Sequence, residues 1–211
     1  MTGPLVELFV SALVTLLVVI DPPGCAPIFT SLTTGATPAH RRAMAIRAVA
    51  IASAILVGFA AVGEAFLSAL GISLDAFRIA GGIMLFLIAA DMVFEKRTAR
   101  RETRASEVAQ QHVEDVSVFP MAIPMIAGPG SIASVMLLTS EAKGPTETAV
   151  VFAALALVLL LTLAALLAAG PLMRLLGHKV EAMITRLLGV ILAALASQIV
   201  IDGIRGAFSL G

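Results

Sequence analysis

The stretch Asp21-Pro22-Pro23-Gly24-Cys25-Ala26-Pro27 interrupts an otherwise apolar run from Leu8 to Leu32. Its three prolines remove three backbone N–H donors and clash with preceding carbonyl groups, and Gly24 adopts backbone angles that other residues avoid. Inside a bilayer, an unpaired backbone group is tolerated only where it is buried in protein or lines a watery cavity. The stretch therefore predicts a membrane helix that opens around a carboxylate.

The composition is that of an integral membrane protein. Apolar residues make up 59% of the chain, charged residues only 13%, and the mean hydropathy is +1.04. The formal net charge of zero gives no basic field for nucleic acid. A single cysteine, Cys25, provides neither an internal disulfide nor a metal site. We expect an all-α fold without a cofactor, and a retained N-terminus because residues 1–8 lack the positive charge of a signal peptide.

Six charge-poor windows are long enough to cross a bilayer, for which about 20 apolar residues are needed. They cover residues 5–32, 38–70, 74–94, 118–139, 147–169 and 183–204. Thr37 and Pro38 favour a helix start, the sequence Gly71-Ile72-Ser73 favours a turn, and Gly170-Pro171 is expected to end the fifth helix before a loop. These windows divide the chain into a three-helix unit (1–95), a charged loop (96–117) and a second three-helix unit (118–211).

The basic residues predict an orientation. If the loops alternate sides, eleven Lys and Arg residues fall on one side and three on the other. The first set is Arg41, Arg42, Arg47, Lys96, Arg97, Arg100, Arg101, Arg104, Arg174, Lys179 and Arg186; the second is Arg78, Lys143 and Arg205. The positive-inside rule places the larger set in the cytoplasm and both termini outside.

The two halves show signs of an internal repeat. Residues 78–87 align with residues 186–195 through shared Arg, Gly, Ile and Leu, and residues 22–24 align with 128–130 through Pro and Gly. Three spans per half would insert the halves in opposite orientations. Chance similarity between apolar segments is the alternative, but each half also carries a helix that should be broken, because the fourth span contains Pro120, Pro124 and Gly128-Pro129-Gly130.

Paired broken helices in inverted halves are a sequence pointer to a transporter site. Opened helix ends expose N–H groups and carbonyl groups, which suit the two charges of a zwitterion. We expect main-chain donors and the Ser131 hydroxyl to hold a carboxylate, and Asp21 with carbonyls near Pro22 to Gly24 to hold an ammonium group or a proton. The predicted substrate-binding residues are Asp21, Pro22, Pro23, Gly24, Cys25, Gly128, Pro129, Gly130 and Ser131.

Three further carboxylates are candidates for ion coupling alongside Asp21. They are Glu64, Asp91 and Asp202, for which an interfacial position in water is the simpler interpretation. Likewise, Pro and Gly also occur in membrane helices as packing kinks. No nucleotide-binding, zinc-protease or nucleophile-elbow motif is present, so we do not expect an enzyme.

The motifs together resemble the MarC family of bacterial and archaeal inner-membrane proteins. The resemblance rests on residues 21–33, 77–94, 120–130 and 198–204 and extends over nearly the whole chain. It implies six spans, a place in the bacterial inner membrane and, from a characterised archaeal relative, transport of small neutral amino acids such as glycine and alanine. The family usually has Asn where this chain has Cys25, so its specificity here is open.

The sequence therefore predicts a secondary transporter of small neutral amino acids, with a proton or sodium as the coupling ion. It leaves open a channel for ions or small solutes, and a membrane scaffold that binds a partner through residues 95–117. Homo-oligomerisation and the direction of transport are likewise left open.

Overall fold

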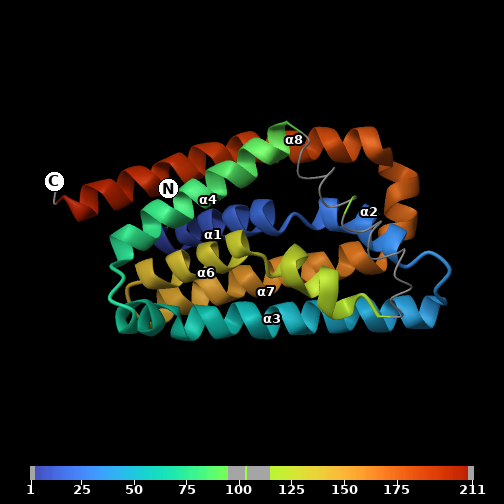
Figure 1. The fold of residues 1–211 in the computed structure, drawn as a ribbon, viewed down its shortest axis with the longest axis horizontal. Helices are drawn as coiled ribbons and strands as arrows, with labels where there is room; N and C mark the ends of the chain where they lie inside the picture. Colours follow the sequence, from blue (N-terminus) through green and yellow to red (C-terminus); the bar gives the residue numbers. More distant parts are fainter. Residues whose placement is uncertain (1–2, 95–102, 104–114, 209–211) are drawn as a thin grey trace.

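The computed structural model describes residues 3–94, 103 and 115–208, except for the side chains of 171–179 and 181. Every element in this part of the chain is a helix. The helices are α1 (Pro4–Ile20), α2 (Pro22–Leu32), α3 (Pro38–Ala69), α4 (Leu74–Val93), η1 (Ser117–Ile126), α6 (Pro129–Glu141), α7 (Pro145–Leu167) and α8 (Ala169–Ala207). Figure 1 shows most of them lying side by side along one axis, while the first part of α8 runs across the right-hand end of the bundle.

The interruption of the first apolar run is confined to one residue. Asp21 adopts left-handed backbone angles, φ 59° and ψ 65°, and a new helix begins directly after it. Pro22 and Pro23 occupy the first turn of α2, where a missing N–H costs little, and Pro27 lies inside the helix. The opening expected over residues 21–27 is therefore much shorter than the prolines suggest.

The fourth apolar window is divided into η1 and α6, which bend by 54° at Ala127–Gly128. Phe119 and Ile123 have extended backbone angles because each precedes a proline, and a residue before proline is pushed out of the helical region. The segment η1 is therefore interrupted by two non-helical residues, and a regular helix follows it that starts with Pro129 at its first position.

The chain directions follow from Figure 1, in which α3 runs the full length of the molecule. We call the end where α2 meets α3 the basic end, because Arg41 and Arg42 lie there, and the end that holds the α3–α4 and α6–α7 connections the terminal end. α1, α2, α4 and α7 run toward the basic end, whereas α3, η1, α6 and α8 run away from it. The C-terminus lies at the terminal end.

Glycines allow α4 and α8 to pack closely as an antiparallel pair. A Cβ at Gly82 would lie 2.6 Å from Cγ2 of Val200, and one at Gly189 would lie 2.8 Å from Cβ of Met92. Buried residues repeat with the same steps of three and four along both helices: Gly82, Leu85 and Ala89 in α4, and Gly189, Leu192 and Ala196 in α8. The two helices thus use matching faces in the same core cluster.

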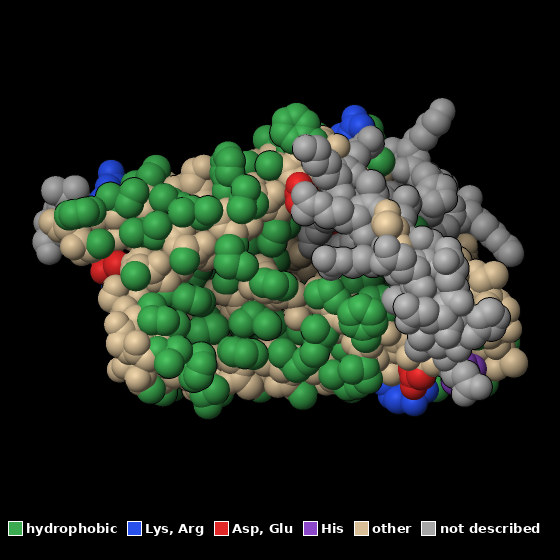
Figure 2. All heavy atoms as spheres, viewed as in Figure 1, with side chains coloured by type: hydrophobic (Ala, Val, Ile, Leu, Met, Phe, Trp, Pro, Cys, Tyr) green, Lys and Arg blue, Asp and Glu red, His purple; other side chains and the backbone are tan. Residues whose placement is uncertain are grey.

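The outer surface suits a lipid environment. Figure 2 shows hydrophobic side chains spread over much of the described part of this face, among which only a few charged side chains appear. The described residues contain five helices that are long and apolar enough to cross a membrane, or six if η1 and α6 form one span.

One expected connection is wrong. α7 ends at Leu167, close to the predicted end of the fifth span, but the loop expected from Gly170-Pro171 onward is helical, because α8 begins at Ala169 and continues to Ala207. A proline in the first turn of a helix loses no intrahelical hydrogen bond, because the N–H groups there have no partner. The predicted charged loop 96–117 falls mostly outside the described residues, as do Lys96, Arg97, Arg100, Arg101 and Arg104 and the side chains of Arg174 and Lys179.

Candidate functional site

Asp21 caps the second helix from a buried position. Asp21 is only 1% exposed, and its Oδ1 accepts a hydrogen bond of 3.2 Å from the backbone N–H of Gly24. A Cβ at position 24 would collide with this carboxylate, so glycine is required for the close approach. The structure thus shows Asp21 as the N-cap of α2.

The end of α1 next to Asp21 is rich in backbone acceptors. In a regular helix, the carbonyls of Val18 and Val19 would receive the N–H groups of Pro22 and Pro23, which prolines lack. The next carbonyl, of Ile20, accepts a contact from Cys25 Sγ at 3.5 Å. The regular helical hydrogen bonds are therefore missing mainly before Asp21, one turn earlier than the Pro22 to Gly24 positions that the sequence suggested.

The start of α6 presents backbone donors. Gly128 is its N-cap, and the Gly128 carbonyl already accepts the N–H of Ile132 at 3.0 Å. Pro129 has no N–H, so the first free donors of this helix are those of Gly130 and Ser131. Position 128 does not accommodate a side chain, because a Cβ there would collide with the Pro124 carbonyl oxygen.

The two interruptions meet in space. A Cβ at Gly130 would lie 3.2 Å from Cγ1 of Val19, two residues before Asp21, and 2.5 Å from Cδ1 of Ile88 in α4. The carbonyl-rich end of α1 thus lies beside the N–H-rich start of α6. Gly24, Cys25, Gly128, Gly130 and Ser131 are all buried, Pro22 is buried and Pro23 half-buried, and only Pro129 is exposed.

Ser134 is a further candidate site residue that the sequence did not indicate. Its Oγ is buried and makes no hydrogen bond to any described residue. Ser134 follows Ser131 by three residues, which places both hydroxyls on neighbouring positions of one helix face, one turn apart. The spacing of Ser131 and Ser134 from the start of the helix is the sequence signal by which Ser134 could have been found. A buried hydroxyl without a partner is unusual, so it indicates that a ligand or water binds there.

The three other candidate carboxylates differ in how close they lie to the two interruptions. Asp91 lies one turn beyond Ile88, which borders Gly130, on the same face of α4 and in the direction of Asp21. Asp202 is exposed, accepts a hydrogen bond of 2.9 Å from Gln198, and neighbours Gly203, which packs against Arg78 near the terminal end. Glu64 is exposed on the terminal half of α3. Of the three, only Asp91 is brought toward the interruptions.

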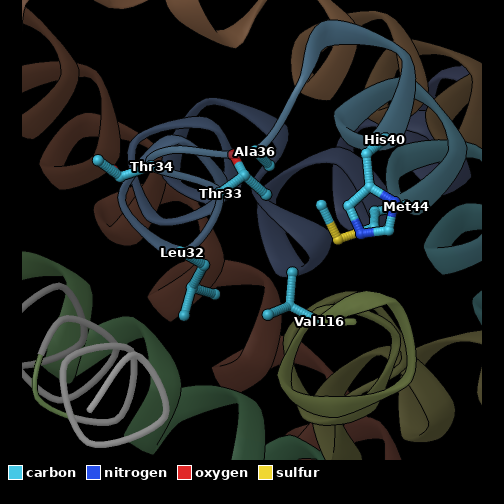
Figure 3. A pocket seen from close by; sticks show the side chains of 7 residues that line it. All are labelled: Leu32, Thr33, Thr34, Ala36, His40, Met44 and Val116. Carbon is cyan, nitrogen blue, oxygen red and sulfur yellow. The ribbon is translucent and has the colours of Figure 1, made fainter. Parts of the chain in front are cut away.

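A cavity of about 350 Å³ opens at the basic end (Figure 3). It is lined by Leu32, Thr33, Thr34, Ala36, His40, Met44 and Val116. Beside it, Arg47 of α3 forms a 2.7 Å ion pair with Asp115, which precedes η1. Hydrogen bonds from Ser117, helped by the charge of Arg47, hold the pKa of Asp115 below its usual value. This pair ties η1 to α3 at the mouth of the bundle.

Comparison with known proteins shows to which family the chain belongs. Residues 6–208 match the MarC family of integral membrane proteins. The chain belongs to the MarC family. It is 37% identical to a UPF0056 membrane protein of Methanocaldococcus jannaschii over 95% of this chain and 98% of the relative. It is 35% identical to the UPF0056 inner membrane protein YhgN of Escherichia coli K12 over 93% of this chain and 95% of YhgN.

A third MarC-family relative, the UPF0056 membrane protein YvbG of Bacillus subtilis, is 35% identical over 94% of this chain and 95% of YvbG. No solved structure matches the chain. The resemblance to the MarC family is therefore confirmed, and the protein is a multi-pass integral membrane protein.

Proposed function

We propose that this MarC-family protein is a secondary transporter of small neutral amino acids, with its substrate site between the α1–α2 interruption and the start of α6. The observation that carries the proposal is the contact of Gly130 with Val19, because it joins the two interruptions at one place. Helix ends of opposite polarity around a buried site are how known transporter folds hold charged substrate groups.

The chemistry fits a zwitterion. The N–H groups of Gly130 and Ser131, with the Ser131 and Ser134 hydroxyls, would hold the substrate carboxylate at the positive end of α6. The carbonyls at the end of α1 and the Asp21 carboxylate would hold the ammonium group. Val19, Leu85 and Ile88 pack directly against Gly130, so little room is left for a substrate side chain, which favours glycine or alanine.

Two inverted halves would supply the moving parts. Each helix of the first half has a counterpart that runs in the opposite direction: α1–α2 with η1–α6, α3 with α7, and α4 with α8. The matching buried faces of α4 and α8 support the same symmetry. Rocking of one half against the other would expose the site to each side in turn.

Asp21 is the proposed coupling carboxylate and Asp91 a second candidate, since both lie beyond the Gly130 contact in the same direction. A carboxylate buried in a membrane protein is costly, and such groups commonly serve ion or substrate pathways. We assign Glu64 and Asp202, which are exposed, to the interface with water.

The direct test is flux into proteoliposomes. We expect saturable uptake of labelled glycine or alanine that responds to an imposed proton or sodium gradient. Uptake that does not saturate and ignores both gradients would favour a channel, and no uptake or release of either amino acid would refute the substrate assignment.

A further inference from the structure

A second cavity at the basic end combines positive charge with apolar walls. Its volume is about 460 Å³, and it lies where the start of α3 meets the end of α7. Its lining residues are Phe29, Ala36, Pro38, Arg41, Arg42, Leu166, Leu167 and Gly170. None of the described residues that line it is acidic.

Two arginines near the start of α3 contribute the positive charge of this cavity. Arg41 is half-buried and Arg42 exposed, and neither forms an ion pair with a described residue. The nearby Arg47 differs, because it is paired with Asp115. The same cavity contains Pro38, the first residue of α3, so the positive end of a 32-residue helix adds to the field. Two guanidinium groups at a helix start suit a phosphate, which accepts bidentate hydrogen bonds.

The rest of the cavity is apolar and opens onto the lipid-facing surface. Leu166 is buried in the wall, while Leu167 is 48% exposed. One turn from Arg42 along α3 lies Ile46, 44% exposed, and two turns from Leu167 along α7 lies Leu160, 63% exposed. These side chains lead from the arginines toward the middle of the membrane-spanning helices. A hydrocarbon chain attached to the bound phosphate would lie along them.

We propose that this Arg41–Arg42 cavity binds a phosphate group, and that its apolar walls select a phosphate carried by an anionic phospholipid. Basic pockets between membrane helices bind anionic headgroups in this way. The site is separate from the α1–α6 interruptions and stands independently of the transport proposal.

The test titrates lipid into the full-length protein in detergent and follows its thermal unfolding midpoint. The probes are phosphatidylglycerol, phosphatidylcholine and inorganic phosphate. We expect phosphatidylglycerol to raise the midpoint most. The double variant Arg41→Gln/Arg42→Gln should bind it about 30-fold more weakly, because each surface arginine contributes about a factor of five.

Two further variants distinguish lipid binding in this cavity from nonspecific attraction of the lipid by positive charge. Lys143→Gln/Arg205→Gln removes the same charge at the terminal end and should bind phosphatidylglycerol like the parent protein. Gly170→Leu fills the cavity without changing charge, and a Cβ there meets no atom within 4 Å, so the variant should fold and lose the lipid effect.

Equal loss in both double variants, or full lipid binding by Gly170→Leu, would overturn the site. Stabilisation by inorganic phosphate equal to that by phosphatidylglycerol would assign the phosphate to a soluble ligand and refute the lipid selection.

Discussion

At the scale of single residues, Asp21 has two separable roles. Its left-handed backbone is one that Asn and Asp adopt more readily than other non-glycine residues, and its side chain caps α2. The negative charge of Asp21 is needed neither for the left-handed backbone nor for the helix cap. The residue can therefore lose its charge without losing its structural role.

We predict that Asp21→Asn unfolds at nearly the same temperature as the parent protein, whereas Asp21→Ala is destabilised. Alanine loses the cap, at a cost of about 1 kcal/mol, and strains the left-handed backbone by about 1 kcal/mol more. Thermal unfolding of both variants in detergent checks this. Equal midpoints for the Asn and Ala variants would show that the cap contributes nothing.

At the scale of elements, the sequence predicted helix starts better than helix continuity. Thr37 caps α3 by accepting the N–H of His40, as its position beside Pro38 indicates, and α4 begins directly after the turn expected at Gly71-Ile72-Ser73. These signals are local. Whether a helix continues through Pro171, or opens at one residue rather than seven, depends on packing around the prolines, which a linear pattern does not contain. Ser134 was missed for the same reason, since its burial depends on neighbouring helices.

The α4–α8 pair gives a prediction at this scale. Gly82→Leu should destabilise the protein by about 1 to 3 kcal/mol, the usual cost of overpacking, because its side chain would meet Val200 and the Ala196 carbonyl oxygen at 3.0 Å. Ala80→Leu, on the exposed face of the same helix, is the control and should unfold like the parent. Equal unfolding midpoints for the two variants would contradict the close packing.

The Arg47–Asp115 pair predicts a response to acid. A carboxyl group whose pKa is lower in the folded protein stabilises the fold above its unfolded pKa, about 3.9, and loses that contribution as the pH falls through the folded value. We expect hydrogen-exchange protection of η1 to decrease below about pH 4. Asp115→Asn should show the lower protection at all pH values; equal protection of η1 in the parent and in Asp115→Asn at pH 7 would show that the pair does not hold η1.

At the scale of the whole molecule, the all-helical membrane fold with five or six candidate spans could be predicted because bilayer thickness fixes helix length and composition reveals the spans. The orientation is a proposal that rests on the positive-inside rule. Cys25 is fully buried, so the native chain provides a silent background for cysteine labelling.

We predict that Lys143→Cys reacts with a membrane-impermeant thiol reagent in intact cells, whereas Arg42→Cys reacts only after the membrane is opened. The reason is that the terminal end faces outward in the proposed orientation. The reverse labelling pattern would show the opposite orientation in the membrane. Labelling of both residues in intact cells would contradict a single defined orientation.

The candidate site was predictable in part. The sequence predicted two broken spans from their Pro and Gly residues, but the contact between Gly130 and Val19 is a tertiary property. The roles of Asp91, Glu64 and Asp202 could not be ranked until the fold showed which of them lies near that contact.

The measurement that tests the central claim most directly is glycine and alanine flux in proteoliposomes that contain the parent protein, Asp21→Asn or the matched control Asp202→Asn. Both variants replace a carboxylate with its neutral isostere, one at the interruptions and one on the exposed surface. We predict that Asp21→Asn loses at least about tenfold in gradient-driven flux, since a charged hydrogen bond contributes about 1.5 to 3 kcal/mol, while Asp202→Asn transports like the parent. Undiminished flux in Asp21→Asn, with both variants folded, would contradict a substrate site at Asp21.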